Sequence, residues 1–159
     1  MKQFFLWSAI ICVSVAACSK SGSSSACTPV EPATEDAAIV AYNTAHGITA
    51  TKLASGLYYQ IVDPGVGAVP KPTSNIRVNY AGKRISNDST FDSNQSFNGA
   101  QLNMGGVIAG WTEGLSLIKS GGTIRLTIPS KLAYGCMASG NVIPANSPLF
   151  FEIKLLAVF

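Results

Sequence analysis

The stretch GGVIAGWTEGL, residues 105–115, predicts a short helix with a tryptophan in its first turn. Trp111, Leu115 and Ile118 stand at positions i, i+4 and i+7, so one apolar stripe runs along the predicted helix Trp111–Lys119. A helix usually begins with a polar cap and buries its large apolar residues one turn later. Trp111 is therefore either a plug in the core or the floor of a pocket.

Four stretches around this helix alternate apolar and polar residues and predict β-strands. Strict alternation indicates strands with one face buried and one face in water, as antiparallel sheets provide. A second short helix is predicted over residues 35–46, because acidic residues begin it and Gly47 follows it. We expect an α+β fold, in which a curved antiparallel β-sheet is half-wrapped around one short α-helix and preceded by a short N-terminal helix. The predicted strands lie in residues 57–62, 76–80, 124–128 and 149–155.

Composition limits the class of protein. The chain has 159 residues, enough for one domain of ordinary size, and its net charge of +3 includes no run of Lys or Arg. Nucleic-acid binders concentrate basic residues on one face, so we expect no nucleic-acid partner. His46 is the only histidine and falls at a predicted helix end, where it caps the helix more often than it acts as a base. The sequence therefore argues against a Ser–His or Cys–His hydrolase, and we expect no metal and no cofactor.

The first residues have the layout of an export signal. Lys2 precedes an apolar stretch over residues 4–15, which is shorter than the roughly 20 residues of a membrane span. The sequence VAAC, residues 15–18, resembles the lipobox of bacterial lipoproteins. This resemblance implies removal of residues 1–17 and acylation of Cys18, and an ordinary signal peptide with a chance cysteine is the alternative. Residues 18–34 are rich in Ser and predict a flexible tether.

Two cysteines remain beyond Cys18, namely Cys27 and Cys136. In an exported protein they could pair and pin the tether to the domain. Two free thiols fit the sequence equally well, and we expect no structural disulfide.

Five segments, taken together, carry a family resemblance. They are RVNYAG (77–82), TFDSN (90–94), GVIAGWTEGL (106–115), GGTIRLTIPSKLAYG (121–135) and VIPANSPLFFEIKLL (142–155). In order and spacing they resemble the FKBP-type peptidyl-prolyl cis–trans isomerases, and the bacterial lipoprotein and periplasmic members, such as the macrophage infectivity potentiator group, look most similar. The resemblance runs over residues 56–159, which leaves residues 35–55 as an N-terminal helix and connector.

This resemblance implies an aromatic pocket between helix and sheet that receives a proline ring. Trp111 would be the floor of the pocket. The hydroxyl of Tyr134 would meet the rotated carbonyl of the substrate, and the backbone N–H of Ile108 would hold the peptide. Asp92 would orient polar groups at the rim. The full set of implied site residues is Tyr80, Phe91, Asp92, Val107, Ile108, Trp111, Tyr134, Ile143 and Phe151.

The implied activity is peptidyl-prolyl cis–trans isomerisation that assists the folding of exported proteins. Partners would be X-Pro segments of unfolded or exported proteins, FK506- or rapamycin-like macrolides, and a lipid bilayer reached through acylated Cys18. The implied location is the bacterial cell envelope, on the outer membrane and facing the periplasm. Two alternatives are a non-catalytic proline-peptide-binding or chaperone module on the same scaffold, and a surface lipoprotein that uses the fold for adhesion.

The sequence departs from the family pattern at two places. CMASGN, residues 136–141, follows the AYG turn, with Ser139 where family members often have a histidine. This change should spare catalysis and bears on substrate preference. One aromatic wall position falls on either Phe97 or Ala100, which would leave that wall thinner than usual. We expect no dedicated chaperone or dimerisation module beside the isomerase domain.

Overall fold

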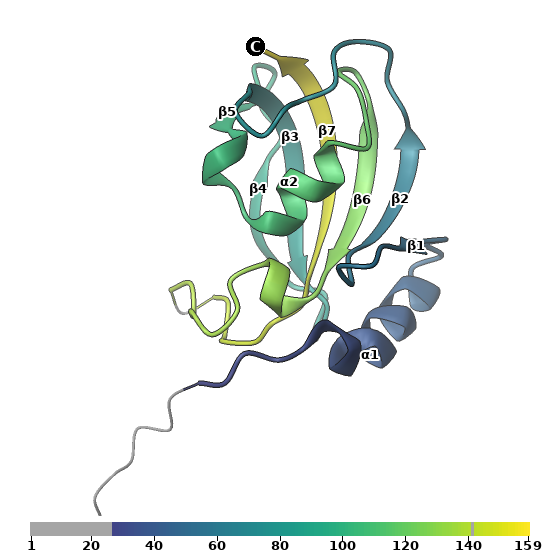
Figure 1. Ribbon diagram of the computed structural model, residues 1–159, viewed down its shortest axis with the longest axis vertical. Coiled ribbons are helices and arrows are strands. Elements are labelled where there is room, and N and C mark those ends of the chain that lie inside the picture. Colours follow the sequence, from purple (N-terminus) through teal and green to yellow (C-terminus); the bar gives the residue numbers. More distant parts are fainter. Residues whose placement is uncertain (1–26, 141) are drawn as a thin grey trace, which may run out of the picture.

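The computed structural model describes residues 27–140 and 142–159, which form a curved antiparallel sheet and two α-helices (Figure 1). The predicted signal peptide and Cys18 lie outside the described residues. The predicted α+β fold class is confirmed. The helices and 3-10 turns are α1 (Pro32–Ala45), η1 (Met104–Gly106), α2 (Ala109–Leu115) and η2 (Ser130–Leu132). The strands are β1 (Thr51–Lys52), β2 (Tyr58–Asp63), β3 (Asn75–Arg84), β4 (Thr90–Asn94), β5 (Ala100–Asn103), β6 (Thr123–Ile128) and β7 (Leu149–Val158).

The sheet is centred on the long antiparallel pair of β3 and β7. Its strand order is β1-β2-β6-β7-β3-β4. β5 pairs with residues 75–78 of β3, whereas β4 pairs with residues 80–83 of the same strand. Two short strands therefore share one edge of β3, and residues 95–99 connect them.

Helix α2 can lie close to β6 because two of its residues have no side chain. A Cβ atom on Gly110 would lie 2.5 Å from Cγ2 of Ile128, and a Cβ atom on Gly114 would lie 2.5 Å from Cδ2 of Leu126. The stripe that begins at Trp111 is buried, as predicted. This close approach fixes the helix, and hence the tryptophan, against the concave face of the sheet.

Several boundaries differ from the sequence predictions. Helix α1 begins at Pro32, inside the predicted tether over residues 18–34, because proline is favoured in the first turn of a helix. Helix α2 ends at Leu115, four residues before the predicted end. The alternation rule finds neither β4 nor β5, since both are short and TFDSN has the composition of a turn.

Helix α1 lies across one end of the sheet (Figure 1). Ile39 and Tyr42 are buried against the domain, whereas Val40 is exposed. His46 occupies the C-cap position, and its Nδ1 lies 2.8 Å from the carbonyl oxygen of Tyr42. No helix in the described part of the chain is long and apolar enough to span a bilayer.

Candidate active site

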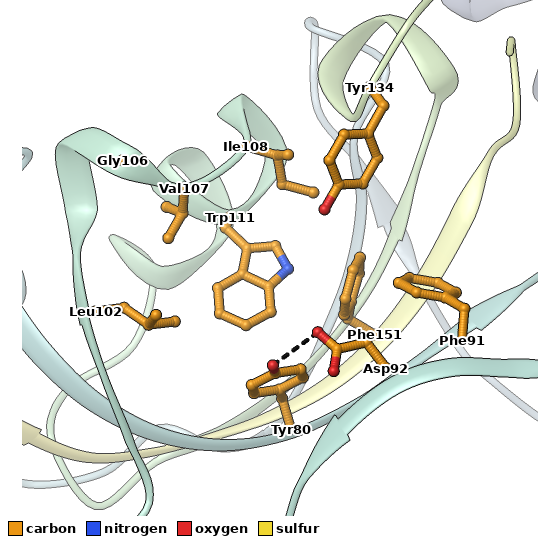
Figure 2. A pocket seen from close by; sticks show the side chains of 10 residues that line it. All are labelled: Tyr80, Phe91, Asp92, Leu102, Gly106, Val107, Ile108, Trp111, Tyr134 and Phe151. Atoms are coloured by element: carbon orange, nitrogen blue, oxygen red, sulfur yellow. Dashed lines mark hydrogen bonds between the residues drawn. The ribbon is translucent and has the colours of Figure 1, made fainter. Parts of the chain in front are cut away.

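A cavity of about 230 Å³ opens between α2, the concave face of the sheet and the turn that follows η2 (Figure 2). All of the predicted site residues line it except Ile143, which is 3% exposed and belongs to the same buried cluster as Trp111 and Phe151. The role of Ile143 at the pocket stays a prediction. Leu102 and Gly106 join the lining, which sequence reasoning missed. The lining residues are Tyr80, Phe91, Asp92, Leu102, Gly106, Val107, Ile108, Trp111, Tyr134 and Phe151.

Four aromatic rings build the apolar part of the cavity by edge-to-face packing. The ring centroids of Trp111 and Tyr80 are 5.2 Å apart, and those of Trp111 and Phe151 are also 5.2 Å apart. Phe91 meets Phe151 at 5.6 Å and nearly at a right angle. Such perpendicular pairs are favoured and hold each ring in one orientation. Trp111 is 4% exposed and lies at the centre of the group, so it forms the floor of the cavity (Figure 2).

Gly82 makes this ring arrangement possible, and sequence reasoning did not assign it a role. It lies on β3, two residues after Tyr80, on the same face of the strand. A Cβ atom at this position would lie 2.6 Å from Cε1 of Phe151 and 2.8 Å from Cζ of Phe91. Only a residue without a side chain leaves both rings in place. The tyrosine-alanine-glycine order of the RVNYAG segment was the available signal.

The polar rim contains one carboxylate and two phenols. The hydroxyl of Tyr80 donates a hydrogen bond of 2.8 Å to Oδ2 of Asp92 (Figure 2). Burial, followed by this hydrogen bond and the negative charge of Asp92, raises the pKa of Tyr80 to about 12. Burial and the charge of Asp92 also raise the pKa of Tyr134. Both phenols are therefore neutral hydrogen-bond donors at neutral pH.

Two donors at the rim of the cavity, besides Nε1 of Trp111 in its floor, have no partner among residues 27–140 and 142–159. The hydroxyl of Tyr134 points into the space above Trp111 (Figure 2), and no side chain or carbonyl described here accepts from it. The backbone N–H of Ile108, at the N-cap of α2, likewise has no acceptor in the described chain. A bound peptide carbonyl could accept from either group.

The wall next to Val107 is aliphatic rather than aromatic. Leu102, on β5, lines the cavity at this side. Neither of the two candidates from the sequence does so: Phe97 is fully exposed, and Ala100 packs at the edge of the core. An aliphatic residue that was neither of the two candidates therefore lines this side of the cavity.

Cys27 and Cys136 form a disulfide, so the expectation of no structural disulfide is wrong. Helix α1 brings the chain before it alongside the segment after Tyr134, although 109 positions separate the two cysteines. Asn146 supports the same contact by donating to the carbonyl oxygen of Thr28 at 3.0 Å. The beginning of the described chain is thus covalently joined to the flank of the cavity.

A sequence profile of the FKBP-type peptidyl-prolyl cis–trans isomerases matches residues 67–156. The chain belongs to this family. FKBP-type peptidyl-prolyl cis–trans isomerase FkpA of Escherichia coli K12 is 44% identical over 104 residues, which are 65% of this chain and 38% of FkpA. The crystal structure of Escherichia coli FkpA superposes with a TM-score of 0.68 at 38% identity, over 80% of this chain and 60% of that one.

Two further relatives have informative names. Outer membrane protein MIP of Legionella longbeachae is 39% identical over 107 residues, which are 67% of this chain and 46% of MIP. FK506-binding protein 1 of Dictyostelium discoideum is 40% identical over 105 residues, 64% of this chain and 96% of that protein. The family assignment made from the five sequence segments is confirmed, and the chain spans about two fifths of the length of FkpA.

Proposed function

We propose that this FKBP-type domain accelerates cis–trans exchange of X-Pro bonds in exported polypeptides. The observation that carries the proposal is the combination of an aromatic cavity, with Trp111 as its floor, and two unpartnered donors at its rim, Tyr134 and Ile108. The cavity contains no histidine or cysteine, which suits a reaction that breaks no covalent bond.

The reaction needs little more than a change of environment. X-Pro exchange crosses a barrier of about 20 kcal/mol because rotation removes the resonance of the amide, and it takes tens of seconds or longer without help. The planar amide has the larger charge separation, so transfer from water into an apolar cavity disfavours it relative to the twisted amide. The apolar rings of Phe91, Trp111 and Phe151 supply that environment.

The polar groups at the rim hold the peptide while the bond rotates. In this mechanism the Ile108 N–H binds a substrate carbonyl and fixes one side of the proline. The Tyr134 hydroxyl donates to the carbonyl that rotates, and it can do so because it has no other acceptor in the described chain and a phenol keeps its proton at neutral pH. Asp92 accepts from Tyr80 and so orients that ring rather than removing a proton from substrate.

We also propose an anchored location in the bacterial envelope. The lipobox-like VAAC sequence supports acylation of Cys18, and the name of the Legionella relative supports an outer-membrane setting. The periplasmic face is the side on which exported X-Pro substrates would be met. The Dictyostelium relative's name supports FK506- or rapamycin-like macrolides as ligands of the same cavity.

The test is acceleration of cis–trans exchange in a short X-Pro peptide, measured by exchange NMR with the full chain in detergent. Tyr134→Phe and Trp111→Leu are compared with Tyr59→Phe, which removes a phenol hydroxyl from β2, outside the cavity. We expect the wild-type chain and Tyr59→Phe to accelerate exchange equally. We expect Trp111→Leu to lose most of the acceleration and Tyr134→Phe to lose on the order of 10-fold, the value of one hydrogen bond.

Peptide binding is measured in parallel by titration of the same NMR signals. If the wild-type chain binds the peptide without accelerating exchange, the isomerase proposal fails and the non-catalytic binding module is the function that remains. A chain in which Trp111→Leu leaves the rate unchanged would place the reaction outside this cavity.

A further inference from the structure

Two residues of the segment that precedes the matched family region, Glu31 and Glu35, contact the turn that carries Tyr134. Residues 67–156 match the family profile, so helix α1 lies outside it. Nζ of Lys131 nevertheless lies 2.8 Å from Oε1 of Glu31, and a carboxylate oxygen of Glu35 accepts from the backbone N–H of Ser130 at 2.8 Å. Both contacts reach η2, which ends two residues before Tyr134.

The Glu35 contact differs from ordinary surface pairs because both partners are buried. Glu35 is 7% exposed and Ser130 is fully buried. A hydrogen bond from a backbone N–H to an ionised carboxylate is stronger than one between neutral groups, and a buried group left without its partner carries a large desolvation penalty. The Glu35 carboxylate therefore fixes the position of the Ser130 peptide.

Ser130 in turn holds the chain on both sides of Tyr134. Its carbonyl oxygen accepts from the N–H of Ala133 at 3.0 Å and from the N–H of Gly135 at 2.8 Å. The residues immediately before and after Tyr134 are thus both bonded to the carbonyl oxygen of Ser130. The N–H of Ser130 is bonded to Glu35. A shift of Ser130 would turn the whole loop and move the tyrosine hydroxyl.

We propose that Glu35 is a positioning residue, which sets the place of the Tyr134 hydroxyl in the cavity from outside the family's core domain. The inference rests on the proposed function in one respect, namely that the Tyr134 hydroxyl takes part in X-Pro exchange. Glu35 itself touches no substrate, since it acts through Ser130.

A second α1 contact provides a matched control. Oδ1 of Asn43 accepts from the hydroxyl of Thr127 at 2.6 Å, and both side chains are buried. This bond also ties α1 to the domain through one buried acceptor, but it ends on β6 rather than on the turn that carries Tyr134. If α1 only stabilises the fold, Glu35→Ala and Asn43→Ala should change hydrogen exchange and kcat/KM to the same extent when they lower the free energy of unfolding by the same amount.

The first experiment measures amide hydrogen exchange by mass spectrometry on full-length chain in detergent, which needs no catalytic activity. We expect exchange in peptides covering residues 130–135 to rise about 10-fold in Glu35→Ala, the effect of losing one buried hydrogen bond on local opening. Asn43→Ala should leave this segment unchanged, and Glu35→Gln should restore protection because its amide oxygen accepts the same bond. Equal exchange in Glu35→Ala and wild type would overturn the inference.

The second experiment is a double-mutant cycle on kcat/KM. Glu35→Ala should lower kcat/KM by less than Tyr134→Phe does, and it should have almost no further effect in a Tyr134→Phe chain, since the group it positions is gone. An equal loss in both backgrounds would show that Glu35 does not act through the hydroxyl. If the wild-type chain lacks isomerase activity, the proposed function fails, whereas the hydrogen-exchange result still decides whether Glu35 positions the turn.

Discussion

Gly114→Ala tests the close packing that places helix α2 against β6. Its effect on the free energy of unfolding should change sign when the opposite residue, Leu126, is truncated. A Cβ atom on Gly114 would lie 2.5 Å from Cδ2, 2.6 Å from Cδ1 and 3.1 Å from Cγ of Leu126. Leu126 is fully buried on β6, so its side chain has little space into which it can retreat. Either the leucine changes rotamer or the helix moves away from the sheet.

The magnitude follows from two opposing effects. Replacing glycine by alanine inside a helix stabilises a protein by about 0.5–1 kcal/mol when there is room for the methyl group. Overpacking a well-filled core costs about 1–3 kcal/mol. We therefore expect Gly114→Ala to lower the free energy of unfolding by about 1–2 kcal/mol. In a Leu126→Ala chain the steric conflict is absent, and Gly114→Ala should raise the free energy of unfolding by about 0.5–1 kcal/mol.

The assay is urea unfolding followed by circular dichroism for the four chains of this cycle. Ile128→Ala serves as a control background, because it truncates a neighbouring buried residue on β6 and leaves Leu126 in place. Gly114→Ala should remain destabilising in that chain. A change of the same sign and size in the wild-type and Leu126→Ala chains would refute the packing argument.

Three further predictions concern the rim, the disulfide and the aromatic rings. The pKa of Tyr80 is raised above its unfolded value of 10.0, so its stabilising effect should be complete below pH 10 and lost as pH rises toward 12. Asp92→Asn should lower this pKa in an ultraviolet titration, and an unchanged pKa would contradict the assigned hydrogen bond. Cys27 and Cys136 should resist thiol reagents in the denatured, unreduced chain, and Cys27→Ser should cost about 2–4 kcal/mol in urea unfolding. Gly82→Ala should lower kcat/KM on the order of 10-fold by displacing two phenyl rings, and an unaffected rate would show that the ring positions do not matter.

The sequence was most informative where local pattern and local structure agree. Residues 124–128 alternate strictly and residues 149–155 have an apolar residue at every second position; both lie in strands, because a half-buried strand imposes a period of two on its side chains. Trp111 was recognised as a possible pocket floor from its unusual position at a helix start. The wall opposite was not recognised, because β5 has only four residues and Leu102 resembles any core leucine in the sequence.

The alternating strands, the apolar stripe that begins at Trp111 and the family can be predicted from the sequence, because each depends on residues close together or on blocks in a fixed order. Which distant residues meet depends on how the elements pack against one another. The disulfide joins positions 109 apart, and the Glu35–Ser130 hydrogen bond joins positions 95 apart. No local periodicity encodes such pairs, since they form only when α1 packs across the end of the sheet. The packing of β3 against β4 and β7 likewise puts Gly82 against the rings of Phe91 and Phe151.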